Sequence, residues 1–301
     1  LLKLGPTDRL CIPVPFYHCF GMVMGTLGCL SHGGTAVIPA PGFDAEATLA
    51  AIEAERCTGV YGVPTMFGAM LGHPDFAGYD LSSLRTGIMA GAVCPIELMK
   101  RCVTEMHMTE VAIAYGMTET SPVSCQTLVD DDLERRTASI GRAHPHVEIK
   151  IVDPDTGDIL ERGQPGEFCT RGYSVMLGYW NDDASTRAAI DADGWMHSGD
   201  LAVMGDDGYC RIVGRLKDMV IRGGENIYPR EVEEFLCTHS DIADAHVVGV
   251  PDVRYGEELC AWIRMTPGRP PLDAEAVRAF ATGKLAHYKI PRYVHIVDEF
   301  P

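Results

Sequence analysis

Short apolar runs that alternate with amphipathic stretches dominate residues 10–121 and most constrain the fold. The runs 59–63, 84–91 and 110–116 are typical of buried strands, and the stretches between them carry apolar residues at helical spacing. Asp44 is placed to cap a helix that continues to Arg56, and Pro64 and Pro95 stand where further helices would begin. This alternation predicts an α/β domain in which helices cover the faces of a parallel sheet.

The pattern of predicted strands, helices and turns changes twice after this region. Beyond residue 136 the strand-like runs become short and the turns dense, and Asp207-Gly208 is a hairpin signal. Beyond residue 215 an amphipathic helix, two strands and another helix follow. We therefore predict a partial large α/β domain over residues 1–136, a β-rich subdomain of it over 137–215, and a small α+β domain over 216–301.

Charge and cysteine content limit the classes of partner. The chain has 25 Lys and Arg against 42 Asp and Glu, a net charge of −17, which argues against nucleic acid or an anionic membrane as partner. Its 11 cysteines include no Cys-x-x-Cys pair, so we expect a reduced compartment and neither disulfides nor a cysteine metal site. The apolar run 21–30 is too short for a transmembrane span and suits a buried core helix.

Residues 115–120 place unusual chemistry at the end of a predicted strand. Ligands of open α/β sheets bind beyond the carboxyl ends of strands. Tyr115 can stack on a base, and Gly116 permits a backbone conformation or ligand approach that a side chain would block. Thr118 can donate to a phosphate oxygen, and Glu119 is a hard oxygen ligand suited to Mg2+. The alternative is a polar turn that merely ends the strand.

Three other stretches can be read in two ways. Asp200 can accept both hydroxyls of a ribose, or it can be an ordinary turn residue. Residues 215–224 suit a hinge followed by a glycine pair that lets a slender ligand pass, or a charged linker and a β-turn. His18 lies in an uncharged segment, where it is either a core histidine or a residue that orients a carboxylate.

Taken together, these stretches resemble the adenylate-forming superfamily of enzymes. The matching motifs are YGMTETSP (115–122), RGYSVMLGYW (171–180), DGWMHSGDLA (193–202) and GRLKDMVIRGGENIYPREVE (214–233). The sequence is most similar in texture to medium-chain fatty acyl-CoA synthetases. The resemblance implies a large α/β domain with a small β-barrel subdomain, followed by a mobile C-terminal domain. It also implies a two-step reaction that uses ATP, Mg2+ and CoA, in which a fatty acid becomes acyl-AMP and then acyl-CoA.

The resemblance assigns nucleotide-binding roles to residues of the first domain. Tyr115 would stack on adenine, and Gly91 and Ala92 would lie on the adenine-binding loop. Thr118 resembles the residue that contacts the α-phosphate. Glu119 resembles the Mg2+ ligand.

The same resemblance assigns roles to residues near the domain boundary. Asp200 would hold the ribose hydroxyls, with Arg215 nearby. Lys217 occupies the position of the family's hinge. Gly223 and Gly224 match glycines that line the pantetheine tunnel after the small domain rotates.

Two residues are implied at the acyl pocket. His18 resembles the residue that lies near the substrate carboxylate, and Gly116 would help to shape the pocket together with the turn at 63–65. Acyl chain length is left open by the sequence, and aryl acids such as benzoate remain candidates.

Two parts of the family pattern have no counterpart in this sequence. One is the Ser/Thr/Gly-rich phosphate loop, and the other is the Pro-x-Thr-x-x-Gly-Lys run whose lysine serves adenylation. Pro301 resembles the first residue of that run. We therefore expect a fragment that forms acyl-AMP very poorly by itself.

Other functions compete with a fatty acyl-CoA ligase. One is an adenylating domain that loads a carrier protein, and another is a catalytically silent nucleotide-binding fragment. A nicotinamide-dependent oxidoreductase is weaker, because no Gly-x-Gly-x-x-Gly follows a predicted strand. The expected location is cytoplasmic, or the mitochondrial matrix in a eukaryote.

Overall fold

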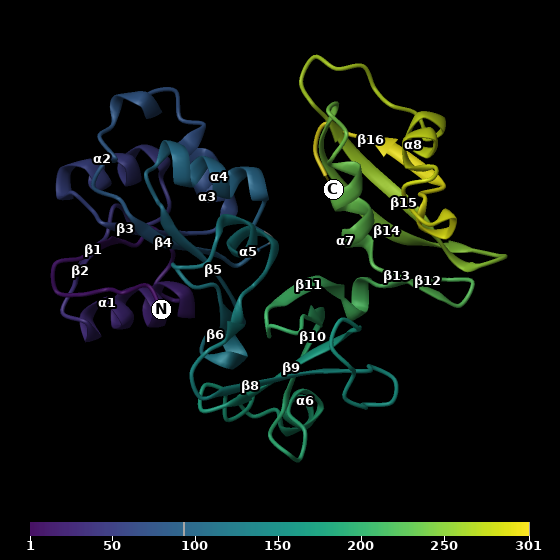
Figure 1. The fold of residues 1–301 in the computed structure, drawn as a ribbon, viewed down its shortest axis with the longest axis horizontal. Helices are drawn as coiled ribbons and strands as arrows, with labels where there is room; N and C mark the ends of the chain where they lie inside the picture. The colour runs from purple at the N-terminus through teal and green to yellow at the C-terminus, as the bar shows by residue number, and fades with distance from the viewer. Residues whose placement is uncertain (93, 301) are drawn as a thin grey trace. The chain divides into compact units, whose positions relative to one another are not determined.

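The computed structural model describes residues 1–92 and 94–300 (Figure 1). The chain forms two compact units. The first contains residues 1–164, 168–198 and 203–211, and the second contains residues 165–167, 199–202 and 212–301. The fold is mixed α/β, as predicted, and it contains three sheets. The domain boundaries at residues 136 and 215 stay predictions.

The first sheet has seven strands in the order β2-β1-β3-β4-β5-β6-β7. Its first five strands are parallel, which confirms the predicted parallel sheet, and β6 and β7 extend it in antiparallel pairing. The strands are β1 (Arg9–Cys11), β2 (Thr35–Val37), β3 (Gly59–Gly62), β4 (Thr86–Ala90), β5 (Glu110–Gly116), β6 (Val123–Gln126) and β7 (Arg142–Ala143).

Three helices cover one side of this sheet, and another helical segment lies on the other side (Figure 1). The covering helices are α2 (Ala45–Glu55), α3 (Pro64–Leu71) and α4 (Ile96–Glu105), followed along the chain by α5 (Leu133–Ala138). The predicted cap of α2 is confirmed, because the Asp44 carboxylate accepts the Ala47 N–H at 2.7 Å. Buried side chains of these three helices and of β3, β4 and β5 form one apolar core.

The helical segment on the other side is η1 (Phe20–Leu27), a π-helical stretch, followed by α1 (Gly28–Ser31). The apolar run 21–30 is helical, as predicted, but it is buried on one side only. Phe20 is buried and its ring stacks on Tyr61 at 5.5 Å, but Met22, Leu27 and Leu30 are 49%, 54% and 58% exposed. A helix that lies on one face of a sheet buries only the side that faces the strands. Among the described residues, no helix is both long and apolar enough to cross a membrane.

The second sheet has four strands in the order β11-β10-β9-β8. Its strands are β8 (Val147–Val152), β9 (Pro165–Gly172), β10 (Met196–Met204) and β11 (Cys210–Arg215). The predicted hairpin joins β10 to β11, and Gly208 adopts the positive φ of 81° that this turn requires. The helix α6 (Asp183–Ala189) lies between β9 and β10 in the chain.

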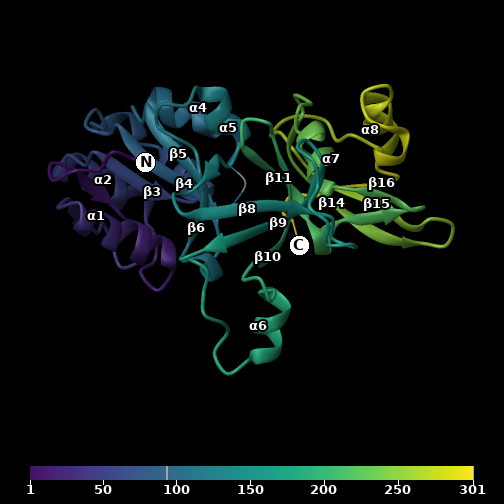
Figure 2. The same cartoon turned by 60° about the horizontal axis from the view of Figure 1, so that its bottom comes forward.

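The third sheet belongs to the second unit and has the order β13-β12-β15-β14, with β16 paired to β15. Its strands are β12 (Val220–Arg222), β13 (Glu225–Ile227), β14 (Ile242–Asp252), β15 (Gly256–Met265) and β16 (Tyr293–Ile296). Figure 2 shows α7 (Pro229–Leu236) and α8 (Ala274–Ala281) against this sheet. Val232 and Leu236 of α7 and Val277 of α8 share its buried core. Four 3-10 turns complete the chain: η2 (Phe76–Gly78), η3 (Thr118–Thr120), η4 (Leu216–Asp218) and η5 (His287–Lys289).

Candidate active site

The carboxyl ends of three parallel strands meet at one edge of the first sheet. Gly62 of β3 is in register with Met89 of β4, and Ala90 of β4 is in register with Ala114 of β5. The residues that follow these strands therefore emerge side by side. They are the 63–65 turn, Gly91 with Ala92, and the segment that begins at Tyr115.

The structure explains why two positions at this edge are occupied by glycine. Gly91 has a φ of +85°, in the region that favours glycine, and an added Cβ would lie 3.1 Å from a Val63 methyl group. A Cβ on Gly116 would lie 1.7 Å from the Pro122 carbonyl oxygen. The close neighbour of Gly116 is therefore the chain's own return into β6, which the sequence pattern did not indicate.

The three residues of the turn η3 have different surroundings. Thr120 is buried, accepts the Met117 N–H at 3.1 Å and donates to the Pro122 carbonyl oxygen at 2.9 Å. Thr118 is exposed and Glu119 half-buried. The buried hydroxyl fixes the turn, and the two neighbouring side chains remain available for a ligand.

Tyr115 lies at the end of β5, beside the Gly91 loop. Its ring makes an edge-on contact with Phe168, with ring centroids 5.0 Å apart. This contact limits the orientations that the half-buried Tyr115 ring can take. A ring held in this way is suited to present a face to a planar base.

His18 lies near the η3 turn through its neighbour. Cys19 Sγ is 3.8 Å from Thr118 Oγ1, and it is 3.7 Å from His18 Nδ1. The Phe20 N–H donates to His18 Nδ1 at 3.0 Å. Because a neutral imidazole has one acceptor and one donor nitrogen, this bond assigns the proton to Nε2. His18 can therefore donate from Nε2 to a carboxylate oxygen.

Glu119 has a partner that the sequence did not predict. The Tyr179 hydroxyl donates to Glu119 Oε1 at 2.9 Å, and the Met176 N–H donates to the Glu119 carbonyl oxygen at 2.8 Å. Both donors come from the RGYSVMLGYW motif, which contributed to the resemblance in the sequence but received no role there.

The residues of the η3 turn fit a magnesium ion that also binds a nucleotide. Glu119 offers one carboxylate, and Thr118 offers a neighbouring hydroxyl. Mg2+ in nucleotide sites is held by one or two carboxylates together with substrate phosphates and waters. The donor set therefore suits Mg2+ bound jointly to Glu119 and a phosphate.

Asp200 and Arg215 form an ion pair in the second unit. Arg215 Nε lies 3.1 Å from Asp200 Oδ1, and the Asp200 side chain is much less exposed than that of Arg215. The preceding Gly199 has a φ of +70°, and its N–H donates to Glu167 Oε1 at 3.0 Å. Sequence analysis did not single out Glu167, which fixes the backbone beside Asp200.

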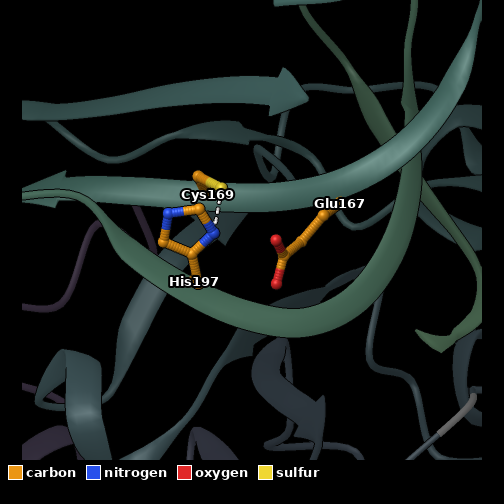
Figure 3. A group of neighbouring side chains, drawn as sticks. All are labelled: Glu167, Cys169 and His197. Carbon is orange, nitrogen blue, oxygen red and sulfur yellow. Dashed lines mark hydrogen bonds between the residues drawn. The ribbon is translucent and has the colours of Figure 1, made fainter. Parts of the chain in front are cut away.

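Figure 3 shows Glu167 with two neighbours on strands β9 and β10. Glu167 and Cys169 are two residues apart on β9 and so project from the same face, toward His197 of β10. Cys169 Sγ lies 3.5 Å from His197 Nδ1, and His197 Nε2 lies 3.6 Å from an Asp191 oxygen. Their three ligand-type atoms lie within 4.8 Å of one another. Structural zinc sites have four protein ligands, and this group offers three.

The other predicted boundary residues also lie in the second unit. Lys217 is exposed on η4, directly after β11. Gly223 and Gly224 form the turn between β12 and β13, with φ values of 62° and 89°. The Gly223 N–H donates to the Tyr255 carbonyl oxygen at 2.8 Å. The positive φ values alone account for glycine at both positions, without any bound ligand.

An open cavity of about 260 Å3 lies in the first unit, with a mainly apolar lining to which Lys3, His32, Gln126 and His144 also contribute. Its lining includes Met24 of η1, Tyr61 of β3, Ile88 of β4 and Val123 of β6. These elements are on the side of the sheet that η1 covers. The segment that begins at His18 thus leads from the η3 turn into the helix that roofs the cavity.

Comparison with known families shows which kind of enzyme this arrangement belongs to. The model of the AMP-binding enzyme family matches residues 2–180, and the model of the AMP-binding enzyme C-terminal domain matches residues 231–301. The chain belongs to the AMP-binding enzyme family. This confirms the predicted membership of the adenylate-forming superfamily.

Relatives in this family match the chain over nearly its whole length. YngI of Bacillus subtilis is 55% identical over 300 residues, covering 100% of this chain and 54% of YngI. The mitochondrial medium-chain acyl-CoA ligase ACSF2 is 50% identical over 293 residues in Danio rerio, covering 97% of this chain and 48% of the relative. Human ACSF2 is 45% identical over 293 residues, with 97% and 48% covered. The chain thus spans about half the length of the curated relatives it matches.

Solved structures of AMP-binding enzymes share this fold. ATP-bound MatB from Rhodopseudomonas palustris gives a TM-score of 0.89 at 31% identity, covering 100% of this chain and 58% of MatB. The o-succinylbenzoate CoA synthetase MenE from Bacillus subtilis, solved with its acyl-adenylate intermediate, gives 0.84 at 29% identity, with 100% and 59% covered.

Proposed function

We propose that this protein is a fatty acyl-CoA ligase that activates medium-chain fatty acids with ATP and transfers the acyl group to CoA. The observation that carries the proposal is the placement of Thr118 and Glu119 at the carboxyl edge of the parallel sheet, with Cys19, the chain neighbour of His18, 3.8 Å from the Thr118 hydroxyl. We assign the substrate carboxylate to His18, the α-phosphate to Thr118 and the metal ion to Glu119. The relatives named as medium-chain acyl-CoA ligases support the same substrates.

Nucleotide-binding roles are assigned residue by residue. Tyr115 offers its ring to adenine, and Gly91 and Ala92 offer exposed backbone beside it. Asp200 accepts the ribose hydroxyls, and its ion pair with Arg215 orients the carboxylate. These roles rest on the motifs and on the local geometry of each residue.

In the first step a fatty-acid carboxylate oxygen attacks the α-phosphorus of ATP, and pyrophosphate leaves. His18 donates from Nε2 to the second carboxylate oxygen and so aims the attacking one. Thr118 donates its hydroxyl to an α-phosphate oxygen, where negative charge accumulates. Mg2+ bound at Glu119 would supply neutralisation of the phosphate charge.

In the second step the CoA thiol loses its proton, its sulfur attacks the acyl carbonyl carbon, and AMP leaves as the carbon–oxygen bond breaks. The pantetheine arm is assigned to the turn of Gly223 and Gly224, whose two residues carry no side chains of their own. Lys217 is assigned to the hinge on which the small domain turns between the two steps. No nucleic acid is needed as a partner.

The acyl tail is assigned to the cavity roofed by η1. Its volume of about 260 Å3 is slightly below the about 300–1,000 Å3 typical of small-molecule pockets, which favours a chain of moderate length. Each buried methylene is worth about 0.8 kcal/mol, so the preference should change by about fourfold per carbon. The selectivity should therefore be graded.

The proposed location is the cytoplasm or, in a eukaryote, the mitochondrial matrix. ACSF2 is named as mitochondrial in the vertebrate relatives. The described residues include eleven free cysteines, which suits a reducing compartment.

The proposal is tested with the full natural protein. Formation of acyl-CoA is measured for straight-chain acids from butyrate to palmitate and for benzoate, with ATP, Mg2+ and CoA. We expect AMP and pyrophosphate to appear with acyl-CoA and the rate to peak at intermediate chain lengths. Acyl-AMP that is never transferred to CoA would instead indicate a carrier protein as acceptor, and absence of any ATP cleavage would contradict a ligase.

A further inference from the structure

The loop that precedes α6 is highly exposed, yet it is fixed at one point. Tyr173 and Trp180 near its ends are 76% and 89% exposed. Between them, the Met176 N–H and the Tyr179 hydroxyl both bond to Glu119, at 2.8 Å and 2.9 Å. The loop is therefore anchored on the residue that we assign to the metal.

The bond from Tyr179 constrains the Glu119 carboxylate. Glutamate has three rotatable side-chain bonds, so an exposed carboxylate samples many orientations. The phenol takes Oε1, and among the described residues no second side chain bonds to this carboxylate. Oε2 remains available to a cation.

The same bond contributes little to folding. Tyr179 is itself more than one third exposed, and the loop around it packs few apolar side chains. Exposed hydrogen bonds of this kind add little to stability because water competes for both groups. A role in orienting Glu119 explains the contact better than a role in holding the fold.

We propose that Tyr179 is a positioning residue that orients Glu119 for a divalent cation bound together with ATP. The inference rests on the proposed function only for the assignment of Glu119 to the metal. Partners that orient a metal ligand typically change metal affinity by about 10- to 100-fold when they are removed.

The first test measures cation binding directly in the full natural protein. Mn2+ replaces Mg2+ as the probe, and its binding to the ATP-loaded protein is followed by electron paramagnetic resonance. We expect Tyr179→Phe to weaken Mn2+ binding by about 10-fold or more while the melting temperature stays unchanged. Tyr173→Phe is the matched control, because it removes an exposed hydroxyl from the same loop without touching Glu119.

A double-variant cycle tests whether Tyr179 acts through Glu119. In the Glu119→Gln background, Tyr179→Phe should cause no further loss of Mn2+ affinity, since the charged oxygen that it orients is already gone. A second readout is the Mg2+ concentration that half-saturates ATP–pyrophosphate exchange. It should rise in Tyr179→Phe, with the KM for the fatty acid unchanged.

Three results would overturn the inference. They are equal Mn2+ affinity in Tyr179→Phe and Tyr173→Phe, additive losses in the double variant, or a lowered melting temperature with unchanged Mn2+ affinity. Failure of the proposed function looks different. It would appear as absence of exchange with every acid in the unmodified protein, whereas the Mn2+ cycle could still support the role of Tyr179.

Discussion

At the scale of single residues, Glu119 is the side chain on which the proposed chemistry most depends. Glu119→Gln keeps the size of the side chain and removes its charge, so the phosphate charge is less well neutralised. A metal ion contributes several kcal/mol to such a transition state, so we expect the rate of acyl-AMP formation to fall by at least about 100-fold. Hydroxamate trapping of acyl-AMP measures this rate, and a loss smaller than about threefold would contradict the assignment.

Asp200 should affect nucleotide binding more than chemistry. Hydrogen bonds to a charged group are worth about 1.5–3 kcal/mol, so Asp200→Asn should raise the KM for ATP by about 10- to 100-fold. The comparison uses 2′,3′-dideoxy-ATP, which lacks the hydroxyls that Asp200 is assigned to hold. This analogue should bind poorly to the unmodified protein and equally poorly to the variant. A further loss in the variant would show that Asp200 acts elsewhere.

His144 should give the fold a dependence on pH. Burial lowers the pKa of His144 below its ordinary value of 6.5, and its Nε2 lies 3.1 Å from Gln126 Oε1. The unfolded chain therefore binds a proton more readily than the folded one. The free energy of unfolding should fall as the pH drops below 6.5 and level off above it. Urea titrations should show this slope in the unmodified protein and a smaller slope in His144→Gln; equal slopes would refute the assignment.

At the scale of elements, the contact between Glu167 of β9 and Gly199 of β10 should be important for stability. Glu167→Ala would leave the Gly199 N–H without its acceptor, which costs about 1–3 kcal/mol for a buried group. Glu167→Gln keeps an acceptor oxygen and should recover most of the loss. Chemical denaturation measures both changes, and Glu161→Ala, at an exposed position, is the control. Equal stability of the Ala and Gln variants would contradict this reading.

Elements with strong local signals were predictable from the sequence. The helix after Asp44 has a cap and a regular apolar spacing, and β3, β4 and β5 are short apolar runs between turns. By contrast, β6 and β7 were not predicted, because runs of four and two residues are too short for a strand pattern to stand out. Their pairing depends on the close approach of Gly116 to Pro122, which is a tertiary contact. The exposed side of η1 was missed for the same reason.

Some features of the candidate site could likewise be predicted from local sequence, and others depend on tertiary contacts. The identities of Tyr115, Thr118 and Glu119 could be read from one motif, since they are adjacent in the chain. The hydrogen bond from Tyr179 to Glu119 could not be predicted from the sequence, because it joins residues 60 positions apart and depends on the path of an exposed loop. The role of Glu167 as hydrogen-bond acceptor could not be predicted either, because nothing distinguishes it from other residues of a strand.

At the scale of the whole molecule, the proposal requires one protein to carry out two steps. The hinge at Lys217 should matter only for the second step. Lys217→Pro fixes φ and restricts the preceding residue, so we expect acyl-AMP formation to persist while acyl-CoA formation falls by at least about 10-fold. Lys217→Ala keeps backbone freedom and should support both steps. Equal loss of both steps in Lys217→Pro would contradict a hinge at this residue.

The order of bond formation in the full natural protein is tested most directly with a fatty acid labelled with 18O in its carboxylate. If a carboxylate oxygen attacks the α-phosphorus and the thiol then displaces AMP, one labelled oxygen must end in the phosphate of AMP. We predict equal amounts of acyl-CoA, AMP and pyrophosphate, with the label in AMP. Label in pyrophosphate or in inorganic phosphate, or acyl-CoA formed with unlabelled AMP, would contradict the proposed adenylate mechanism.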